Sequence, residues 1–150
     1  MYRGRFAPTP SGPLHLGSLV AAVGSYLDAK AHQGEWLVRI EDVDKPRAIP
    51  GAADTILTQL ESHGLEWDGS VLYQSQRDST YQSQLDQLQK AELLYQCDCS
   101  RQAIRARNDH YDGYCRNRQP RTPPYALRFI NNAPITEFND RAQGLLSDHS

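Results

Sequence analysis

The chain has 150 residues, of which 39% are hydrophobic and 23% are charged, and its formal net charge is −2. These values are typical of a folded globular protein, and they exclude a wholly disordered chain and a uniformly basic nucleic-acid-binding protein. No stretch approaches the length of a transmembrane helix and the amino terminus lacks the apolar core of a signal peptide, so we expect a cytoplasmic protein with no membrane partner.

The first 95 residues alternate between patterns typical of strands and of helices. Short apolar segments predict strands at 4–7, 35–41 and 71–73, and the run Trp36–Val38 favours burial on both faces. Periodic apolar residues predict helices at 16–32 and 51–63 and a third helix that Asp78 caps. The first helix has its apolar residues at Leu16, Leu19, Val20, Val23 and Leu27, and the third at Tyr81, Leu85, Leu88 and Leu94. This alternation indicates an α/β fold, with a Rossmann-like parallel half-sheet over residues 1–95.

A different composition begins near residue 95, where cysteine, arginine, asparagine and proline replace the apolar periodicity. Residues 126–130 and 135–138 have the pattern of two strands of a hairpin. We therefore expect a second, small α+β unit over residues 96–150.

The loop after the first predicted strand carries the densest motif, P-T-P-S-G-P-L-H-L-G-S over residues 8–18. In an open parallel sheet, ligands bind beyond the carboxyl ends of the strands, and the amino end of a helix favours phosphate. His15, at the first turn of the helix, can donate a hydrogen bond to a phosphoryl oxygen as negative charge develops. A proline-rich structural turn is the competing interpretation, but the full string P-T-P-S-G-x-x-H-x-G is more restrictive than such a turn requires.

The second predicted strand ends in R-I-E-D-V-D, which places Glu41, Asp42 and Asp44 at the same edge of the sheet. A carboxylate there can hold a substrate ammonium group and Arg5 can hold a substrate carboxylate, so the pair suits an α-amino acid. Glu41 ends a buried strand and therefore needs a partner for its charge. Asp42 and Asp44 serve equally well as caps of the loop before Pro46.

Together, the segments RFAPTPSGPLHLGS and LVRIEDVDKPR resemble the catalytic domain of the class I glutamyl-tRNA synthetases. The resemblance is closer to their shortened relatives, the glutamyl-queuosine tRNA(Asp) synthetases, and it covers essentially the whole chain. It implies ATP-dependent activation of L-glutamate to glutamyl-adenylate, with Mg²⁺ accompanying ATP, and transfer to tRNA by an enzyme that is a monomer when complete.

The same resemblance implies roles for individual residues. It assigns catalysis to His15 and Ser18, where Ser18 replaces the second histidine of the ATP signature, as it does in the shortened relatives. The residues implied for ATP binding are Pro8, Gly12, His15, Gly17 and Ser18. Those implied for glutamate binding are Arg5, Phe6, Ala7, Pro8, Thr9 and Glu41.

The three cysteines, Cys97, Cys99 and Cys115, are odd in number and follow no export signal, which favours a metal site over disulfides. Zn²⁺ takes four ligands, and on chemistry alone His110 is the natural fourth. The family resemblance implies Tyr111 instead, four residues before Cys115. Three unrelated reduced thiols are the competing interpretation.

Seven arginines and only two acidic residues lie between residues 101 and 128. In the family the zinc-containing inserted unit faces the acceptor end of tRNA, and the arginines fit that role, whereas a solvated surface is the alternative. The seven are Arg101, Arg105, Arg107, Arg116, Arg118, Arg121 and Arg128.

The sequence lacks one feature that the family implies, a mobile loop with a catalytic lysine, because its only lysines are Lys30, Lys45 and Lys90. We therefore expect a truncated chain that is poorly stable alone and does not form glutamyl-adenylate. Three other functions compete: a glutamyl-tRNA synthetase fragment that charges tRNA(Glu), a nucleotidyltransferase that uses only the H-x-G signature, and a non-catalytic, zinc-dependent RNA-binding module. The charges of Arg5 and Glu41 argue against the nucleotidyltransferase, because they suit an amino acid.

Overall fold

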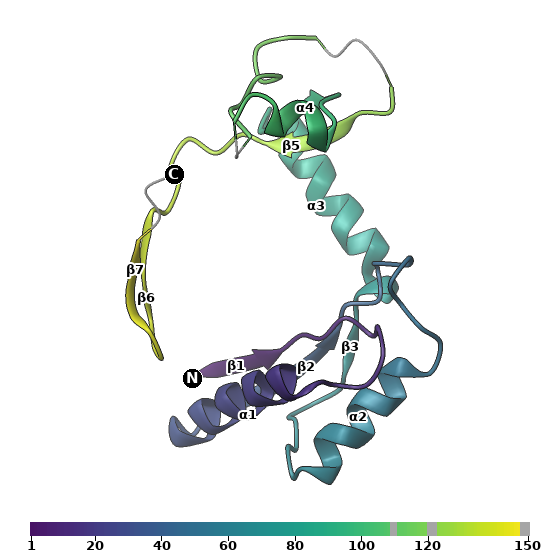
Figure 1. Ribbon diagram of the computed structural model, residues 1–150, viewed down its shortest axis with the longest axis vertical. Coiled ribbons are helices and arrows are strands. Elements are labelled where there is room, and N and C mark those ends of the chain that lie inside the picture. The colour runs from purple at the N-terminus through teal and green to yellow at the C-terminus, as the bar shows by residue number, and fades with distance from the viewer. Residues whose placement is uncertain (109–110, 120–122, 148–150) are drawn as a thin grey trace. The chain divides into compact units, whose positions relative to one another are not determined.

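The computed structural model describes residues 1–108, 111–119 and 123–147, and Figure 1 shows its elements. The chain divides into two compact units, Met1–Tyr81 and Gln82–Ser150. The division falls within helix α3 (Asp78–Lys90). Over the ranges described, no helix is both long and apolar enough to cross a membrane.

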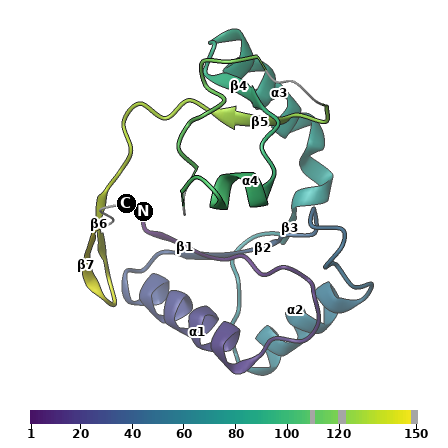
Figure 2. The ribbon, with the colours of Figure 1, turned by 45° about the horizontal axis from the view of Figure 1, so that its top comes forward.

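The first unit is built on a parallel sheet whose strands lie in the order β1–β2–β3. Helix α1 connects β1 to β2, and α2 connects β2 to β3. Because both right-handed crossovers advance in the same direction across the sheet, both helices cover the same face (Figure 2). The elements are β1 (Arg3–Phe6), α1 (Leu16–Ala31), β2 (Glu35–Ile40), α2 (Ala52–Ser62) and β3 (Leu72–Tyr73). The predicted parallel α/β sheet is confirmed.

The core of this unit lies between the sheet and its two helices. Strand β1 and helix α1 approach closely at Gly4, where an added Cβ would lie 3.1 Å from the Cβ of Ala29. A larger side chain at either position would separate the two elements. The fully buried large side chains of this core are Trp36, Val38, Ile40, Ile56 and Leu60.

The predicted apolar face of α1 is only partly the face that packs on the sheet. Leu19 and Val23 pack against the core, but Leu16, Val20 and Leu27 are 78%, 62% and 59% exposed. The close approach at Gly4 explains the difference, because it turns the small side chains of the helix toward the sheet. Apolar spacing alone therefore predicted too wide a buried face.

Strand β2 is fully buried on one face only. Trp36, Val38 and Ile40 point toward the helices, whereas Leu37 and Arg39 alternate with them and are half-buried. The expectation that Trp36–Val38 is buried on both faces is therefore wrong for the described chain. The physical reason is that both helices cover the same face of the sheet.

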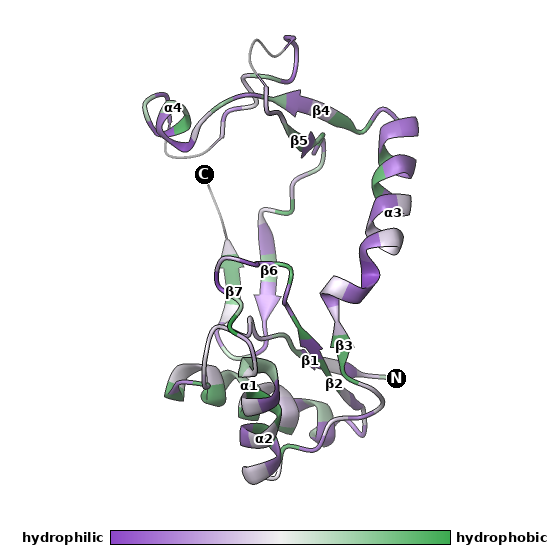
Figure 3. Ribbon diagram, turned by 90° about the vertical axis from the view of Figure 1, so that its right-hand side faces the viewer, coloured by the Kyte–Doolittle hydropathy of each residue, from purple (hydrophilic) through white to green (hydrophobic). Residues whose placement is uncertain are grey.

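The second unit begins with a helix that contributes no buried residue. Helix α3 follows the short 3-10 helix η1 (Gln74–Arg77), so Asp78 is the first residue of α3 rather than a cap, and the helix is mostly hydrophilic in Figure 3. Leu94 was predicted on this helix but starts strand β4 (Leu94–Cys97). The helix ends earlier because Glu92 adopts a left-handed conformation, with φ of 55°, which reverses the chain.

The remaining strands form two antiparallel pairs. Strand β4 pairs with β5 (Ala126–Phe129), and β6 (Glu137–Asp140) pairs with β7 (Gly144–Ser147). The two strands predicted at 126–130 and 135–138 thus exist, but they do not pair with each other as a hairpin. Each has a better-matched partner: β5 lies alongside β4, and β6 turns directly into β7. A one-and-a-half-turn helix, α4 (Arg101–Arg105), follows β4.

Candidate functional site

The loop after β1 and the first turn of α1 enclose a pocket of about 300 Å³. Its walls come from one continuous stretch of sequence, which explains why the motif could be recognised without the fold. Seven of the predicted site residues line it: Phe6, Ala7, Pro8, Thr9, Gly12, His15 and Ser18.

Hydrogen bonds from other elements hold this loop in place. The backbone N–H of Leu14 donates to the side-chain oxygen of Gln59 on α2 at 2.7 Å. The loop after β2 is tied to it as well, because Glu41 N donates to Pro8 O at 2.9 Å and Ile49 N donates to Pro10 O at 2.8 Å. Gly12 has a φ of 134°, a conformation that L side chains rarely adopt. The loop is therefore fixed on both sides of its glycine.

His15 is the N-cap of α1 and binds Ser18 through both ring nitrogens. Its Nδ1 accepts from the backbone N–H of Ser18 at 3.2 Å, and its Nε2 lies 3.0 Å from Ser18 Oγ. Because Nδ1 accepts, the neutral ring carries its proton on Nε2 and donates it to the hydroxyl oxygen. The hydroxyl hydrogen of Ser18 is then free to be donated to a ligand.

Gly17 makes room for this arrangement. A Cβ at Gly17 would lie 3.2 Å from Cε1 and 3.3 Å from Nδ1 of His15, closer than most real Cβ contacts. The glycine of the motif thus acts by leaving this space to the His15 ring. The amino end of α1, which carries partial positive charge, faces the same place and has no acidic residue in its first turn.

Arg5 and Glu41 lie on the sheet face opposite α1 and α2. Arg5 is exposed, between the buried Gly4 and Phe6. Glu41 has the partner that its position requires, but the partner is Arg39, whose Nη2 donates to Glu41 Oε1 at 2.5 Å. Within the described ranges, the structure therefore does not bring Arg5 or Glu41 into the pocket.

Asp42 and Asp44 are held by neighbouring residues. The Asp42 carboxylate accepts from Ser75 N at 2.9 Å and from Ser75 Oγ at 2.5 Å. Slight burial raises the pKa of Asp42, but the two hydrogen bonds from Ser75 lower it by more than burial raises it. The resulting pKa is below its ordinary value. Asp44 pairs with Arg47, with 2.5 Å between carboxylate and guanidinium. Both contacts stabilise the loops after β2 and β3.

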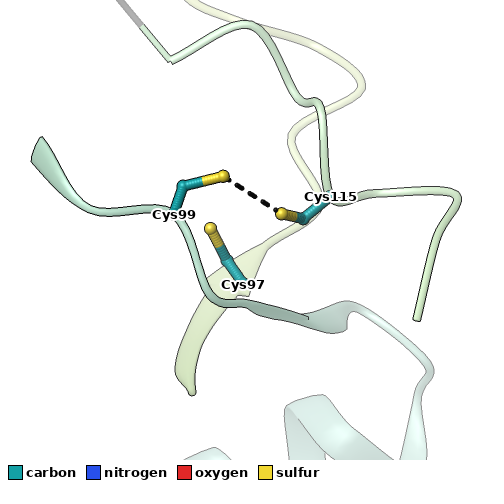
Figure 4. A group of neighbouring side chains, drawn as sticks. All are labelled: Cys97, Cys99 and Cys115. Carbon is teal, nitrogen blue, oxygen red and sulfur yellow. Dashed lines mark hydrogen bonds between the residues drawn. The ribbon is translucent and has the colours of Figure 1, made fainter. Parts of the chain in front are cut away.

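The three cysteine sulfurs converge, as Figure 4 shows, and all lie within 4.8 Å of one another. Cys97 ends β4, Cys99 follows it, and Cys115 comes from the segment 111–119. Cys97 and Cys115 are buried, and Cys99 lies 3.3 Å from Cys115, sulfur to sulfur, without a disulfide. Around a tetrahedral Zn²⁺ with Zn–S bonds of about 2.3 Å, the sulfurs stand about 3.8 Å apart. This cluster can therefore hold a metal ion.

Tyr111 lies against the same sulfurs. Its hydroxyl accepts from the backbone N–H of Cys115 at 3.0 Å and hydrogen-bonds to Cys97. Burial, together with this bond to Cys97, raises the pKa of Tyr111 well above its ordinary value. His110, the alternative fourth ligand, lies outside the described residues.

The environment of Cys97 favours a thiolate. Burial raises its pKa, but hydrogen bonds from the Arg128 side chain and the Cys99 backbone outweigh burial and bring the pKa to about 6. A thiol that is largely deprotonated near neutral pH is suited to metal ligation. Cys99 shifts in the other direction, because burial and its contact with Cys115 raise its pKa.

Comparison with known proteins agrees with the pocket and the sheet. The family of class I tRNA synthetases (E and Q), catalytic domain, matches residues 1–140. The chain belongs to this family. The matched residues include both those that line the pocket and the three cysteines.

Individual relatives and a solved structure are similar to this chain over almost its whole length. The glutamyl-Q tRNA(Asp) synthetase of Idiomarina loihiensis is 87% identical over 150 residues, which is 100% of this chain and 53% of that protein. The protein of the same name from Pectobacterium atrosepticum is 53% identical, over 97% of this chain and 45% of its own length. A crystal structure of a glutamate tRNA ligase from Elizabethkingia meningosepticum in complex with its amino acid matches with a TM-score of 0.75 and 30% identity, over 97% of this chain and 36% of that chain. The chain spans about half the length of the curated relatives it matches.

The arginine-rich stretch also holds contacts that sequence reasoning missed. Arg107 donates a hydrogen bond to Cys99 Sγ, Arg118 lies beside Cys115, and Arg128 lies beside Cys97. Spacing gave no signal for this, except that Arg118 follows Cys115 by three residues. Arg101 and Arg105 are exposed, as is Arg116, while Arg121 lies outside the described residues.

Proposed function

We propose that the chain carries the ATP site and part of the glutamate site of a ligase that activates L-glutamate and transfers it to tRNA. The observation that carries this proposal is the pocket at the amino end of α1, which gathers seven of the predicted ATP and glutamate residues. Family membership and the glutamyl-Q tRNA(Asp) synthetase relatives support it. The acceptor that we propose is the queuosine of tRNA(Asp), which places the reaction in the cytoplasm.

In the proposed reaction, a carboxylate oxygen of glutamate attacks the α-phosphorus of ATP, forms the adenylate and releases pyrophosphate. A hydroxyl of the tRNA then attacks the activated carbonyl and releases AMP. The charge that develops on the phosphoryl oxygens needs donors that are already in place. Ser18 Oγ–H and the N–H groups at the start of α1, at Leu16 and Gly17, fill this role, while His15 Nε2–H holds Ser18 Oγ in position. Mg²⁺ would accompany the triphosphate.

Arg5 is the residue we propose for a carboxylate of the substrate. Its guanidinium is exposed and presents a planar pair of donors suited to a carboxylate. We propose Glu41 for the substrate ammonium group, although its carboxylate already forms an ion pair with Arg39. Because both lie on the sheet face opposite α1 and α2, they would bind the amino acid from that side, and the phosphates would lie at the helix end.

We also propose that Cys97, Cys99, Cys115 and Tyr111 hold a structural Zn²⁺. The convergence of three sulfurs and of the Tyr111 hydroxyl supports this ligand set. When bound, the metal would join the end of β4 to the segment that contains Tyr111 and Cys115, which has few apolar anchors of its own. The site is closed by protein ligands, and this favours a structural role over a catalytic one.

A second acceptor, tRNA(Glu), is favoured by the likeness to the glutamate tRNA ligase structure. A chimera separates the two: these 150 residues replace the matching segment of the Idiomarina loihiensis relative, and labelled glutamate is offered with each purified tRNA. We expect ATP-dependent glutamylation of queuosine-containing tRNA(Asp) and none of tRNA(Glu). Labelling of tRNA(Glu) alone would refute the acceptor. A zinc-dependent RNA-binding module predicts that both tRNAs bind and neither is labelled.

A further inference from the structure

Each of the three cysteine sulfurs has an arginine of its own. Arg107 Nη2 donates to Cys99 Sγ at 3.5 Å. Arg128 lies beside Cys97. Arg118 lies beside Cys115 and is joined to it through Asp98, whose Oδ1 accepts from Arg118 Nη2 at 2.5 Å and from Cys115 Sγ at 3.6 Å. The pairing is one to one, although the arginines come from three different places in the sequence.

Two of these arginines are fixed by a second set of contacts around one ring. The guanidinium groups of Arg107 and Arg118 lie 4.2 Å and 4.6 Å from the ring centroid of Tyr114. Each also binds a carboxylate: Arg107 pairs with Asp112 at 3.1 Å, and Arg118 pairs with Asp98 at 2.5 Å. Side chains held on two sides lose little freedom when they bind a sulfur, so they are prepared for this contact.

The third arginine lies against the fourth proposed ligand. The guanidinium of Arg128 is 3.6 Å from the ring centroid of Tyr111, and its Nε is buried without a partner in the described residues. Strand β5 brings Arg128 here by pairing with β4, where Arg128 lies opposite Tyr95. A half-buried guanidinium whose Nε is buried favours a compensating negative charge, and the Cys97 thiolate is the one beside it.

The charges of this assembly balance. Three thiolates with one Zn²⁺ leave one negative charge in a partly buried site, which is costly unless it is compensated. The three guanidinium groups carry three positive charges, and the two carboxylates that bind Arg107 and Arg118 carry two negative ones. Together these side chains contribute one positive charge, which offsets the negative charge of the metal and its thiolates. With Tyr111 neutral, the formal total is zero.

We propose that Arg107, Arg118 and Arg128 are positioning residues of the metal centre, each holding one cysteine thiolate and compensating its charge, and are not tRNA contacts. This rests on the metal site proposed above. It divides the arginine-rich stretch in two, because Arg101 and Arg105 are exposed and, in the described structure, make no contact with a sulfur.

The test compares charge-removing, charge-keeping and remote variants of the same chain. Zn²⁺ affinity is measured by competition with a chromophoric chelator, and the cobalt form is followed by its thiolate-to-metal absorption. Loss of a partner that orients a metal ligand typically weakens metal binding by about 10- to 100-fold, which is the loss we expect for Arg107→Gln. Arg105→Gln alters the same stretch away from the sulfurs and should stay within about threefold of the parent. Arg107→Lys keeps the charge but loses the planar group that lies on Tyr114 and pairs with Asp112, so its loss should be smaller than that of Arg107→Gln. The cobalt absorption should change in Arg107→Gln and match the parent in Arg105→Gln.

The outcomes separate the two proposals. A parent chain that binds neither Zn²⁺ nor Co²⁺ refutes the metal site itself. A parent that binds both, with Arg107→Gln unchanged, overturns the role of the arginine. An equal loss of zinc affinity in Arg105→Gln or in Arg107→Lys also overturns the role of the arginine. A loss of tRNA affinity in Arg107→Gln at unchanged zinc content overturns it as well. If Arg107→Gln does not fold, Arg118→Gln and Arg118→Lys are judged by the same criteria.

Discussion

Replacing Gly17 by alanine should weaken ATP binding while leaving the helix intact. The new Cβ would lie 3.2 Å from Cε1 and 3.3 Å from Nδ1 of His15, so the imidazole must move by a few tenths of an ångström and release Ser18. A hydrogen bond to a charged group contributes about 1.5–3 kcal/mol. At about 1.4 kcal/mol per tenfold change, losing one such bond to a phosphate weakens ATP affinity by about 10- to 150-fold.

Gly24 supplies the matched control, because it lies on the same helix and a Cβ there meets nothing within 4 Å. Alanine is favoured over glycine inside a helix by about 0.8–1.0 kcal/mol, so Gly24→Ala should raise the free energy of unfolding by that amount and leave ATP affinity unchanged. Both variants are made in the chimera with the Idiomarina loihiensis relative and measured by calorimetric titration with Mg²⁺–ATP and by thermal unfolding. Parent-like ATP affinity in Gly17→Ala, or an equal loss in Gly24→Ala, would refute the role of His15 in the pocket.

Three further predictions concern the core, a loop and the cysteine cluster. Leu60→Ala removes a fully buried side chain and should lower the free energy of unfolding by about 2–5 kcal/mol in urea denaturation; a loss below 1 kcal/mol, roughly that of a surface change, would contradict the described core. The folded pKa of Asp42 lies below its ordinary 3.8, so its contribution to stability is present above pH 3.8 and is lost as pH falls through the folded pKa. Asp42→Asn should therefore flatten the acid side of the stability profile relative to the parent, and parallel profiles would count against the Ser75 contact. Cys115→Ala should reduce bound zinc, measured by atomic emission, from about one ion per chain to almost none, and full retention of zinc would contradict the ligand set.

The sheet and its helices were predictable where periodicity reflects burial. In β2, Trp36, Val38 and Ile40 alternate with less buried residues, and in α2, Ile56 and Leu60 recur at helical spacing. These patterns predict which elements form. Which side of an element faces the core depends on contacts between distant residues. The exposure of Leu16 follows from the close approach at Gly4, and no local pattern near Leu16 contains that information.

The same distinction applies to the sites. The pocket residues Phe6 to Ser18 are continuous in sequence and could be identified as a motif, whereas the pairing of Glu41 with Arg39 could not, because strand alternation places several charges on one face. The cysteines were identifiable from their spacing. Arg128 was not, because β5 pairs with β4 rather than with the strand that follows it.

Glutamate-dependent exchange of pyrophosphate into ATP tests the central claim most directly, because it requires an ATP site and a glutamate site but no tRNA. The chimera that carries these 150 residues should catalyse exchange with L-glutamate and not with aspartate or glutamine. Losing one preorganised donor to a transition state typically lowers the rate by about 10²- to 10³-fold, and His15→Ala should cause a loss of that order because it releases the Ser18 hydroxyl. Exchange that is independent of glutamate, or that persists at the parent rate in His15→Ala, would contradict the assignment of this pocket.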